Sequence, residues 1–315
     1  MDDGDLFAVL NPAKNEAGYC CVLGNAREVF GMSMYLGSEG LSIYRRMQGG
    51  IESQEEDYEF ARIQKCLLVT FDGRDDLEKE DKAVIKALGL KFKGRNAWPV
   101  FRSHRPDCAP WFLEMEEIQF LTAALEQAVD VAQRFKEKPL LLVPPTPEHY
   151  FLRAQVTENG STRWEDRWLE PEPYEPPKLP APKVNEMQVA MTLKKAVNQI
   201  GQWEIELLTM PAPIMDGDRP YYARFLMCAD SDSGCIVCAD VLNAQSYRDA
   251  VASSIMSAME KAGVKPRKIV VRQHEMEELL APTMRLLNIG LARVERLPAV
   301  EEAKEGLFAH FGGGM

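Results

Sequence analysis

The sequence lacks any apolar run that approaches the roughly 18 residues a membrane-spanning helix requires. It also lacks a basic leader, because it opens with the acidic residues Met1-Asp2-Asp3-Gly4-Asp5 and no long apolar segment follows. These absences predict a cytoplasmic protein that has no membrane partner.

Cysteine patterns and common catalytic motifs are missing as well. The seven cysteines form no convincing disulfide or zinc pattern, so we expect reduced thiols and no metal site built from them. Glycine-rich phosphate loops, nucleophile elbows and dinucleotide fingerprints are absent, and no cofactor is predicted. Three of the four histidines, His149, His274 and His310, have no partner at catalytic spacing.

The composition is that of a globular protein. Hydrophobic residues make up 46% of the chain and charged residues 27%, and 315 residues suit two domains better than one. The formal net charge is −11, and acidic residues outnumber basic ones in both halves. Bulk charge therefore disfavours nonspecific binding to duplex nucleic acid.

A proline-rich stretch predicts the domain boundary. Six of the fourteen residues from Glu170 to Lys183 are proline, and such a segment continues neither a helix nor a sheet. We predict an N-terminal α/β domain over residues 1–170, a linker over 171–183 and a C-terminal domain over 184–315.

The first domain is predicted to be mixed α/β. Short apolar runs between turn residues predict strands at 7–11, 19–23, 29–36, 65–71, 140–143, 150–156 and 162–169, with a weak strand near 91–101. Apolar residues at helical spacing predict helices at 41–47, 52–64, 76–88 and 114–136. Up to residue 136 the order can be written βββαβαβα.

The second domain shows that order more clearly. After a helix at 186–200, strands are predicted at 203–210, 221–230, 234–242, 268–272 and 291–296. Helices are predicted at 246–262, 275–288 and 299–311. The order βββαβαβα is that of the RNase H-like fold, which nucleases, transposases and integrases share. A diverged duplication would explain why both domains can be written this way.

Short matches strengthen the resemblance of the second domain to integrase cores. Trp203-Glu204-Ile205-Glu206 resembles the Trp-x-x-Asp that opens those cores, and Glu206 falls on the first-strand acid. The segment 265–269 resembles the Pro-x-x-Ile approach to the fourth strand. The resemblance then breaks, because Arg272-Gln273-His274 stands where that family has Asp followed by Asn-Gly.

The resemblance implies two metal ions held by acids on the first strand, the fourth strand and a later helix. An arginine at position 272 brings positive charge where a ligand is needed, so we predict a degenerate site and no catalytic residue. The alternative is a metal-dependent phosphodiesterase that uses Glu206 with Glu302 or Glu305. Glu301, Glu302 and Glu305 also suit a solvated helix start.

The first domain contains the other candidate site. From Lys82 to Pro106 there is no acidic residue, and from Lys91 to Trp111 basic residues alternate with aromatic ones. Such a mixture suits an anionic ligand, a nucleic acid or an acidic protein partner. The predicted binding residues are Arg95, Trp98, Phe101, Arg102, His104, Arg105 and Trp111. Alternatively the aromatic residues anchor a long loop, and the arginines cap helices or pair with acids such as those at 52–57.

The two halves together resemble an uncharacterised bacterial two-domain family made of domains of unknown function. The likeness is carried by Trp-Pro-Val-Phe-Arg-Ser at 98–103 followed by Pro-Trp at 110–111, and by Arg-Pro-Tyr-Tyr at 219–222 followed by Asp-Ser-Gly at 232–234. It implies no activity. The sequence therefore predicts a non-catalytic binding protein of two α/β modules.

Overall fold

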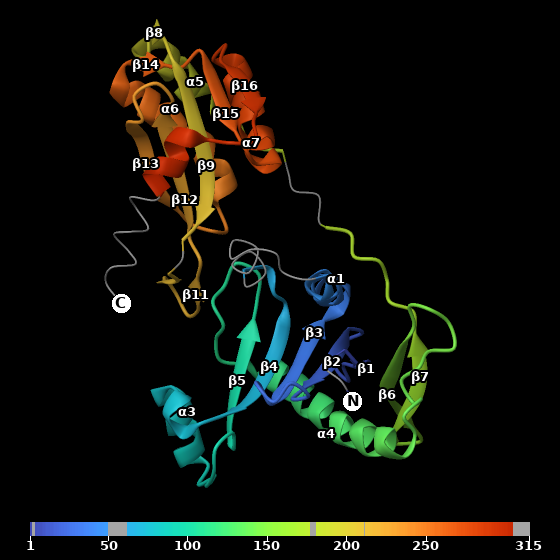
Figure 1. The fold of residues 1–315 in the computed structure, drawn as a ribbon. Helices are drawn as coiled ribbons and strands as arrows, with labels where there is room; N and C mark the ends of the chain where they lie inside the picture. Colours follow the sequence, from blue (N-terminus) through green and yellow to red (C-terminus); the bar gives the residue numbers. More distant parts are fainter. Residues whose placement is uncertain (2–3, 50–61, 177–180, 211, 305–315) are drawn as a thin grey trace. The chain divides into compact units, whose positions relative to one another are not determined.

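The computed structural model describes residues 1, 4–49, 62–176, 181–210 and 212–304. The chain divides into two compact units, Met1–Pro177 with Gly217–Pro220, and Lys178–Asp216 with Tyr221–Met315. Each unit has its own sheet and its own buried cores (Figure 1). Among the described helices, none combines the length and the apolar character that crossing a bilayer requires. The predicted boundaries at 170 and 184 stay a prediction.

The first unit is built on a seven-stranded sheet in the order β5-β4-β3-β2-β1-β6-β7. Neighbouring strands are antiparallel except β1 and β6, which run parallel. The strands are β1 (Leu6–Leu10), β2 (Ala17–Leu23), β3 (Gly31–Leu36), β4 (Cys66–Asp72), β5 (Trp98–His104), β6 (Tyr150–Glu158) and β7 (Ser161–Leu169).

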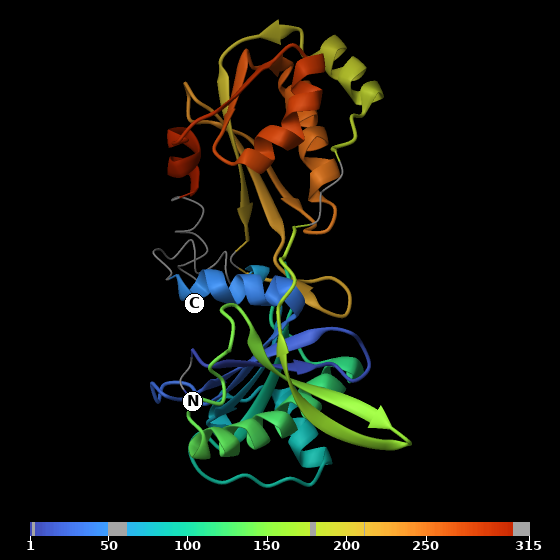
Figure 2. The ribbon, with the colours of Figure 1, turned by 90° about the vertical axis from the view of Figure 1, so that its right-hand side faces the viewer.

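Two helices cover opposite faces of this sheet (Figure 2). On one face, α1 (Gly37–Gln48) packs its Leu41 into a core that contains Tyr19 of β2. On the other face, α4 (Met115–Glu137) packs its Leu121 against Cys20, the next residue along β2. Alternate residues of a strand point to opposite faces, so the apolar runs of this sheet are buried on both sides.

A short helix lies between β4 and β5. The chain forms η1 (Arg74–Asp76) and then α3 (Lys79–Ala87), which lies at the side of the sheet beside β5 (Figure 1). No residue of α3 is buried. The predicted helix at 76–88 is thus confirmed in place, but it contributes little to the core.

The second unit has a five-stranded sheet in the order β13-β12-β9-β15-β16. β9 is central, antiparallel to β12 and parallel to β15. Two-residue strands form separate pairs, β10 with β11 and β14 with β8. The strands are β8 (Asn198–Gln199), β9 (Gln202–Thr209), β10 (Ile214–Met215), β11 (Pro220–Tyr221), β12 (Arg224–Asp230), β13 (Ile236–Leu242), β14 (Val264–Lys265), β15 (Lys268–Val271) and β16 (Gly290–Arg293).

Helices cover both faces of this sheet unequally. A large core joins one face to three helices, α5 (Glu186–Lys195), α6 (Tyr247–Ala262) and α7 (His274–Leu286). The other face carries a smaller core that includes Val300, from the helical residues 298–304. The order from β9 onward confirms the predicted RNase H-like arrangement of a mixed α/β fold.

Several sequence predictions need correction. Residues 140–143 form turns and no strand, because Pro139, Pro144 and Pro145 flank them and cannot donate to a ladder. The weak strand near 91–101 is β5, which begins at Trp98. The predicted helix 186–200 ends at Lys195. Residues 52–61 of the predicted helix 52–64, and the predicted helix beyond residue 304, lie outside the described residues.

The two sheets are connected differently. In the first unit β4 pairs with β3, whereas in the second unit the corresponding strand, β15, pairs with the first strand, β9. The shared element order therefore does not produce a shared topology. The first unit therefore does not contain a second copy of the RNase H-like arrangement.

Candidate functional site

The acid predicted for the first strand, Glu206, lies in the central strand of the second unit. β12 pairs with β9 at Glu206 itself, and β15 pairs with the other side of β9 up to Ile205, so Glu206 lies in the middle of the sheet. The side chain is only 2% exposed. A carboxylate this deeply buried needs compensation for the hydration that it loses.

Two cationic side chains supply that compensation. Arg272, directly after β15, donates a hydrogen bond to Oε1 of Glu206 and forms an ion pair with it. The Nζ atom of Lys304 lies 3.6 Å from Oε2. The residue that replaces the expected fourth-strand aspartate therefore binds the first-strand acid. Since an arginine stays protonated, this position offers an ion-pair partner where a metal ion would need a ligand.

The other acid on this face of β9 has a structural role. Glu204 is buried, and its Oε2 accepts hydrogen bonds from the backbone N–H groups of Ala299, at 2.8 Å, and Val300, at 3.2 Å. These groups belong to the first turn of the helical residues 298–304, where backbone donors have no partner within the helix. Glu204 thus fixes the start of that helix against the sheet.

We expect Glu204→Ala to lower the free energy of unfolding by about 2 kcal/mol, because two buried backbone donors lose their acceptor. Hydrogen exchange of the segment 298–304 should rise more than that of α6. Glu204→Gln keeps an acceptor oxygen, so a smaller loss is expected. Equal stability of the alanine variant and the wild type would contradict this role.

The helical acids of the phosphodiesterase alternative are differently placed. Glu302 is exposed, while Glu301 pairs with Arg296 at 2.8 Å. The side chain from this helix that reaches Glu206 is that of Lys304. Glu305 lies outside the described residues. Sequence reasoning missed both Lys304 and the capping by Glu204, although the alternation of Glu204 and Glu206 already placed both on one strand face.

Three acidic residues of the first unit, at the end of β4 and in the first turn of α4, also have partners within the unit. Asp72 accepts a hydrogen bond from Thr70 at 2.8 Å, and Glu116 pairs with Lys14. Glu117 accepts from Ser103 at 2.7 Å. Over the described part of the chain, no group of three or more His, Cys, Asp or Glu residues is arranged to hold a metal ion.

The predicted binding stretch 91–111 contains the edge strand β5, and its two central arginines are paired internally. Arg102 makes a two-pronged contact with Asp81 of α3, at 2.9 and 2.7 Å, and lies 3.0 Å from Glu78. The hydrogen bond to Asp81 is the largest of the causes that raise the pKa of Arg102. Arg105 pairs with Glu114 and Glu117, at 2.7 and 2.8 Å.

The acids at 52–57 that the sequence suggested as partners lie outside the described residues. The partners seen for Arg102 and Arg105 come from the starts of α3 and α4, where acidic residues also suit the helix dipole. Among the described residues, Arg102 and Arg105 are thus paired with acids of their own unit, and the identity of these partners required the fold.

Most of the aromatic side chains of the stretch, and His104, are half-buried. The Phe92 and Trp98 rings pack edge to face with centroids 5.7 Å apart, and Trp111 packs in the same way on Phe112 at 5.1 Å. Burial, followed by nearby arginine charges, lowers the pKa of His104 to about 4. The imidazole is therefore neutral near pH 7 and adds no positive charge.

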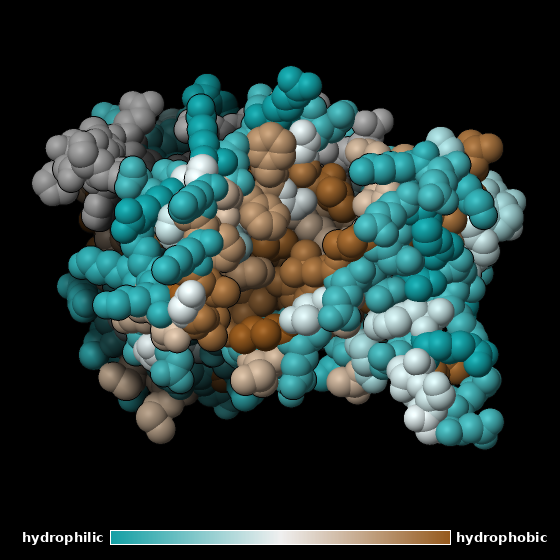
Figure 3. Space-filling model, turned by 90° about the horizontal axis from the view of Figure 1, so that it is seen from below, coloured by the Kyte–Doolittle hydropathy of each residue, from teal (hydrophilic) through white to brown (hydrophobic). Residues whose placement is uncertain are grey.

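Two of the predicted binding residues are exposed, Arg95 and Phe101. Phe101 lies opposite Val69 of β4, which belongs to the core beneath α4, so its ring is on that face of the sheet. Phe71 is exposed as well, and it lies on the same face because it is two residues after Val69 along β4. Figure 3 shows apolar residues gathered in a hollow on the first unit.

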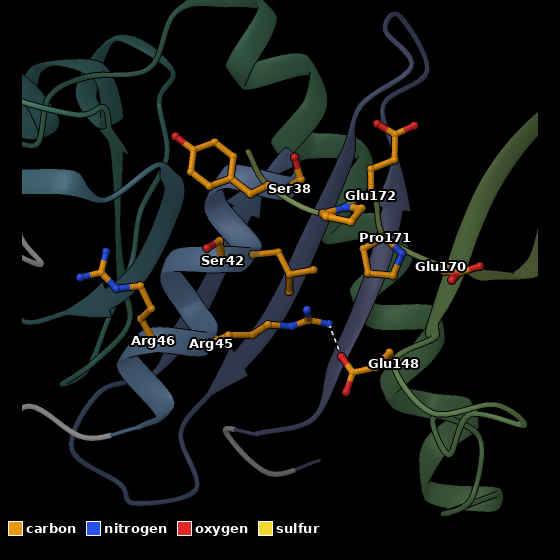
Figure 4. A pocket seen from close by; sticks show the side chains of 11 residues that line it. Ser38, Ser42, Arg45, Arg46, Glu148, Glu170, Pro171 and Glu172 are labelled. Atoms are coloured by element: carbon orange, nitrogen blue, oxygen red, sulfur yellow. Dashed lines mark hydrogen bonds and ion pairs between the residues drawn. The ribbon is translucent and has the colours of Figure 1, made fainter. Parts of the chain in front are cut away.

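A pocket that the sequence did not predict lies between α1 and the start of the proline-rich stretch (Figure 4). Its volume is about 560 Å³. Arg45 extends across it to Glu148, at 2.7 Å, and also donates to the Tyr150 hydroxyl at 3.0 Å. Pro171 and Pro173 line the opposite side. The lining carries both signs of charge, from Arg45 and Arg46 and from Glu148, Glu170 and Glu172.

Comparison with known proteins finds two families that match parts of the chain. Residues 1–153 match a family described as a domain of unknown function (DUF7309), and residues 190–308 match a second (DUF6930). Neither match spans half of the chain, and together they support the coarser part of the predicted resemblance, two domains of unknown function in one chain.

Two solved structures of the HTLV-2 integrase catalytic core domain with magnesium, a dimeric and a trimeric form, are similar to part of the chain. Each is 12% identical, with a TM-score of 0.27, and the match covers 35% of this chain and 68% of that chain. No curated protein matches the chain. We therefore describe the fold by the strand order of its sheets.

Proposed function

We propose that this chain is a non-catalytic binding protein of the cytoplasm, in which the RNase H-like unit serves as a scaffold. The observation that carries the proposal is the burial of Glu206 between Arg272 and Lys304. The seven cysteines all lie among the described residues and form no disulfide with one another, in keeping with a reducing compartment.

The chemistry of the site supports this proposal. Two-metal hydrolysis needs carboxylates that bridge the metals and neutralise charge on both the attacking and the leaving oxygen. Here the carboxylate charge is already balanced by side chains attached to the sheet and to the terminal helix. Binding a divalent cation would require breaking the ion pair that Arg272 forms with the buried Glu206 carboxylate, which is costly.

The first unit provides the contact surface in this proposal. Within the predicted stretch 91–111, the internal pairs of Arg102 and Arg105 position β5 relative to α3 and α4. Arg95 and Phe101 remain exposed for a partner. In this proposal the paired arginines hold the edge of the sheet in place, and the exposed residues contact the partner.

A hydrolysis assay tests the non-catalytic proposal. We expect purified full-length protein to leave labelled single- and double-stranded DNA and RNA intact in millimolar Mg²⁺ or Mn²⁺. The Glu206→Gln variant should also leave them intact. Hydrolysis by the wild type that is lost in Glu206→Gln, and in Glu302→Gln or Glu305→Gln, would establish the phosphodiesterase alternative instead. Activity that survives Glu206→Gln would point to a contaminant, which repurification of both proteins resolves.

A further inference from the structure

The segment 82–95 of the first unit has a charge unlike that of the rest of the chain. It contains five basic residues and no acidic one, in a protein whose formal net charge is −11. All five are exposed: Lys82, Lys86, Lys91, Lys93 and Arg95. Glu80 and Asp81 come just before it, in the first turn of α3. Exposed positive charge is thus concentrated from the second turn of α3 onward.

The same segment presents large apolar side chains. Val84 is 57% exposed, Leu88 66% and Leu90 49%, and α3 has no buried residue. These side chains therefore contribute little to the core of the first unit. Single exposed apolar residues are ordinary, but three within seven positions on a surface of one charge indicate a contact surface.

The two ends of the segment are fixed by contacts within the unit. Asp81 at the start of α3 holds Arg102 of β5, and their side chains are 10% and 12% exposed. At the other end, the Phe92 ring packs on Trp98, the first residue of β5. Because the backbone is already positioned, little ordering is required when a partner binds.

We propose that segment 82–95 is the docking surface for an acidic segment of a partner protein that also carries apolar side chains. The proposal rests on the binding function proposed above and names the class of partner. Carboxylates of the partner pair with the five exposed cations, and its apolar side chains cover Val84, Leu88 and Leu90. Electrostatic complementarity gives such a contact its specificity, and apolar burial contributes affinity.

Other anionic partners fit the surface less well. Single-stranded nucleic acid binds through exposed aromatic faces on which bases stack, whereas Phe92 and Trp98 are half-buried against each other. An anionic bilayer would attract the five cations, but as an extended surface it would also face other acidic parts of a chain of net charge −11, whereas a short acidic segment contacts the cations alone. An acidic protein segment uses both the charge and the apolar side chains.

Fluorescence anisotropy with full-length protein tests the proposal. The probe is a labelled peptide of about 16 residues, rich in glutamate, with leucines at helical spacing. The comparison peptide has the same composition in scrambled order. We expect the amphipathic peptide to bind about fivefold or more tightly than the scrambled one, and to weaken as salt is raised.

Substitutions locate the binding on the surface. The triple variant Lys86→Glu/Lys91→Glu/Lys93→Glu should weaken binding of the amphipathic peptide by about tenfold or more, because like charges then face each other. Leu88→Ser/Leu90→Ser should weaken it by about fivefold through lost apolar burial. Matched controls at exposed positions in and after the last turn of α4, Lys136→Glu/Lys138→Glu and Leu140→Ser, should leave it unchanged.

Equal affinity for the two peptides, or equal loss in the variants and their controls, would overturn the proposal. So would tighter binding, sensitive to the triple variant, by an oligonucleotide, by phosphatidylserine vesicles or by a second copy of the chain. Circular dichroism of each variant separates a binding defect from unfolding. None of these results depends on Glu206, so a failure here is distinguishable from hydrolytic activity in the second unit.

Discussion

Arg272→Ala is expected to lower the free energy of unfolding of the second unit by about 3 kcal/mol, because it removes the closest counter-charge of a buried carboxylate. Glu206 is held in the centre of the sheet and cannot turn to water, and Lys304 contacts only its other oxygen. Hydrogen exchange of β9 and β15 in the full-length protein measures the loss, since those strands flank the pair.

Two comparisons show whether the loss comes from the ion pair. Arg293→Ala, at an exposed position in the neighbouring strand β16, should cost less than about 0.5 kcal/mol. Adding Glu206→Gln to Arg272→Ala should recover part of the stability, because the uncompensated charge is gone. An Arg272→Ala variant as stable as the Arg293→Ala control would show that Glu206 does not depend on this partner.

Arg102→Ala is expected to lower the stability of the first unit by about 3 kcal/mol. The guanidinium is 12% exposed, makes the two-pronged contact with Asp81 and lies 4.8 Å from the centre of the Phe112 ring. Its loss leaves the mostly buried carboxylate of Asp81 without its cationic partner and frees α3 from β5. Urea unfolding, with hydrogen exchange of α3, measures both effects.

Charge and exposure can be separated at this position. Arg102→Lys keeps the charge but not the planar fork, so an intermediate loss is expected. Arg163→Ala, which removes an exposed arginine from pairs with Glu158 and Glu165, should change stability far less. If Arg102→Ala instead weakened the binding of a partner while the stability of the first unit stayed unchanged, Arg102 would belong to the contact surface and would not be a residue that holds β5 in place.

The sequence was informative about the second unit because strand patterns and spacing are local. Apolar runs and turn residues place β9 and β15, and they put Glu206 and Arg272 at positions that the RNase H-like order brings together. Lys304 could not be inferred in the same way. Its contact with Glu206 joins residues far apart in the chain and depends on how the terminal helix lies across the sheet.

The first unit shows a different limit. The acid-free stretch and its aromatic residues are visible in the sequence, but the partners of Arg102 are set by the crossing of α3 beside β5. Charge pattern alone does not distinguish a paired arginine from an exposed one. For that reason the exposed cations of α3 and its following loop become evident as a surface only once Arg102 and Arg105 are seen to be occupied.

Titration of Mn²⁺ followed by electron paramagnetic resonance, with wild-type protein and Glu206→Gln in parallel, tests most directly whether Glu206 is a structural carboxylate. The free-ion signal should be the same for both proteins up to millimolar Mn²⁺, because Arg272 and Lys304 already balance the charge. Mn²⁺ that is bound by the wild type and released in Glu206→Gln would contradict the account and restore a metal-dependent function.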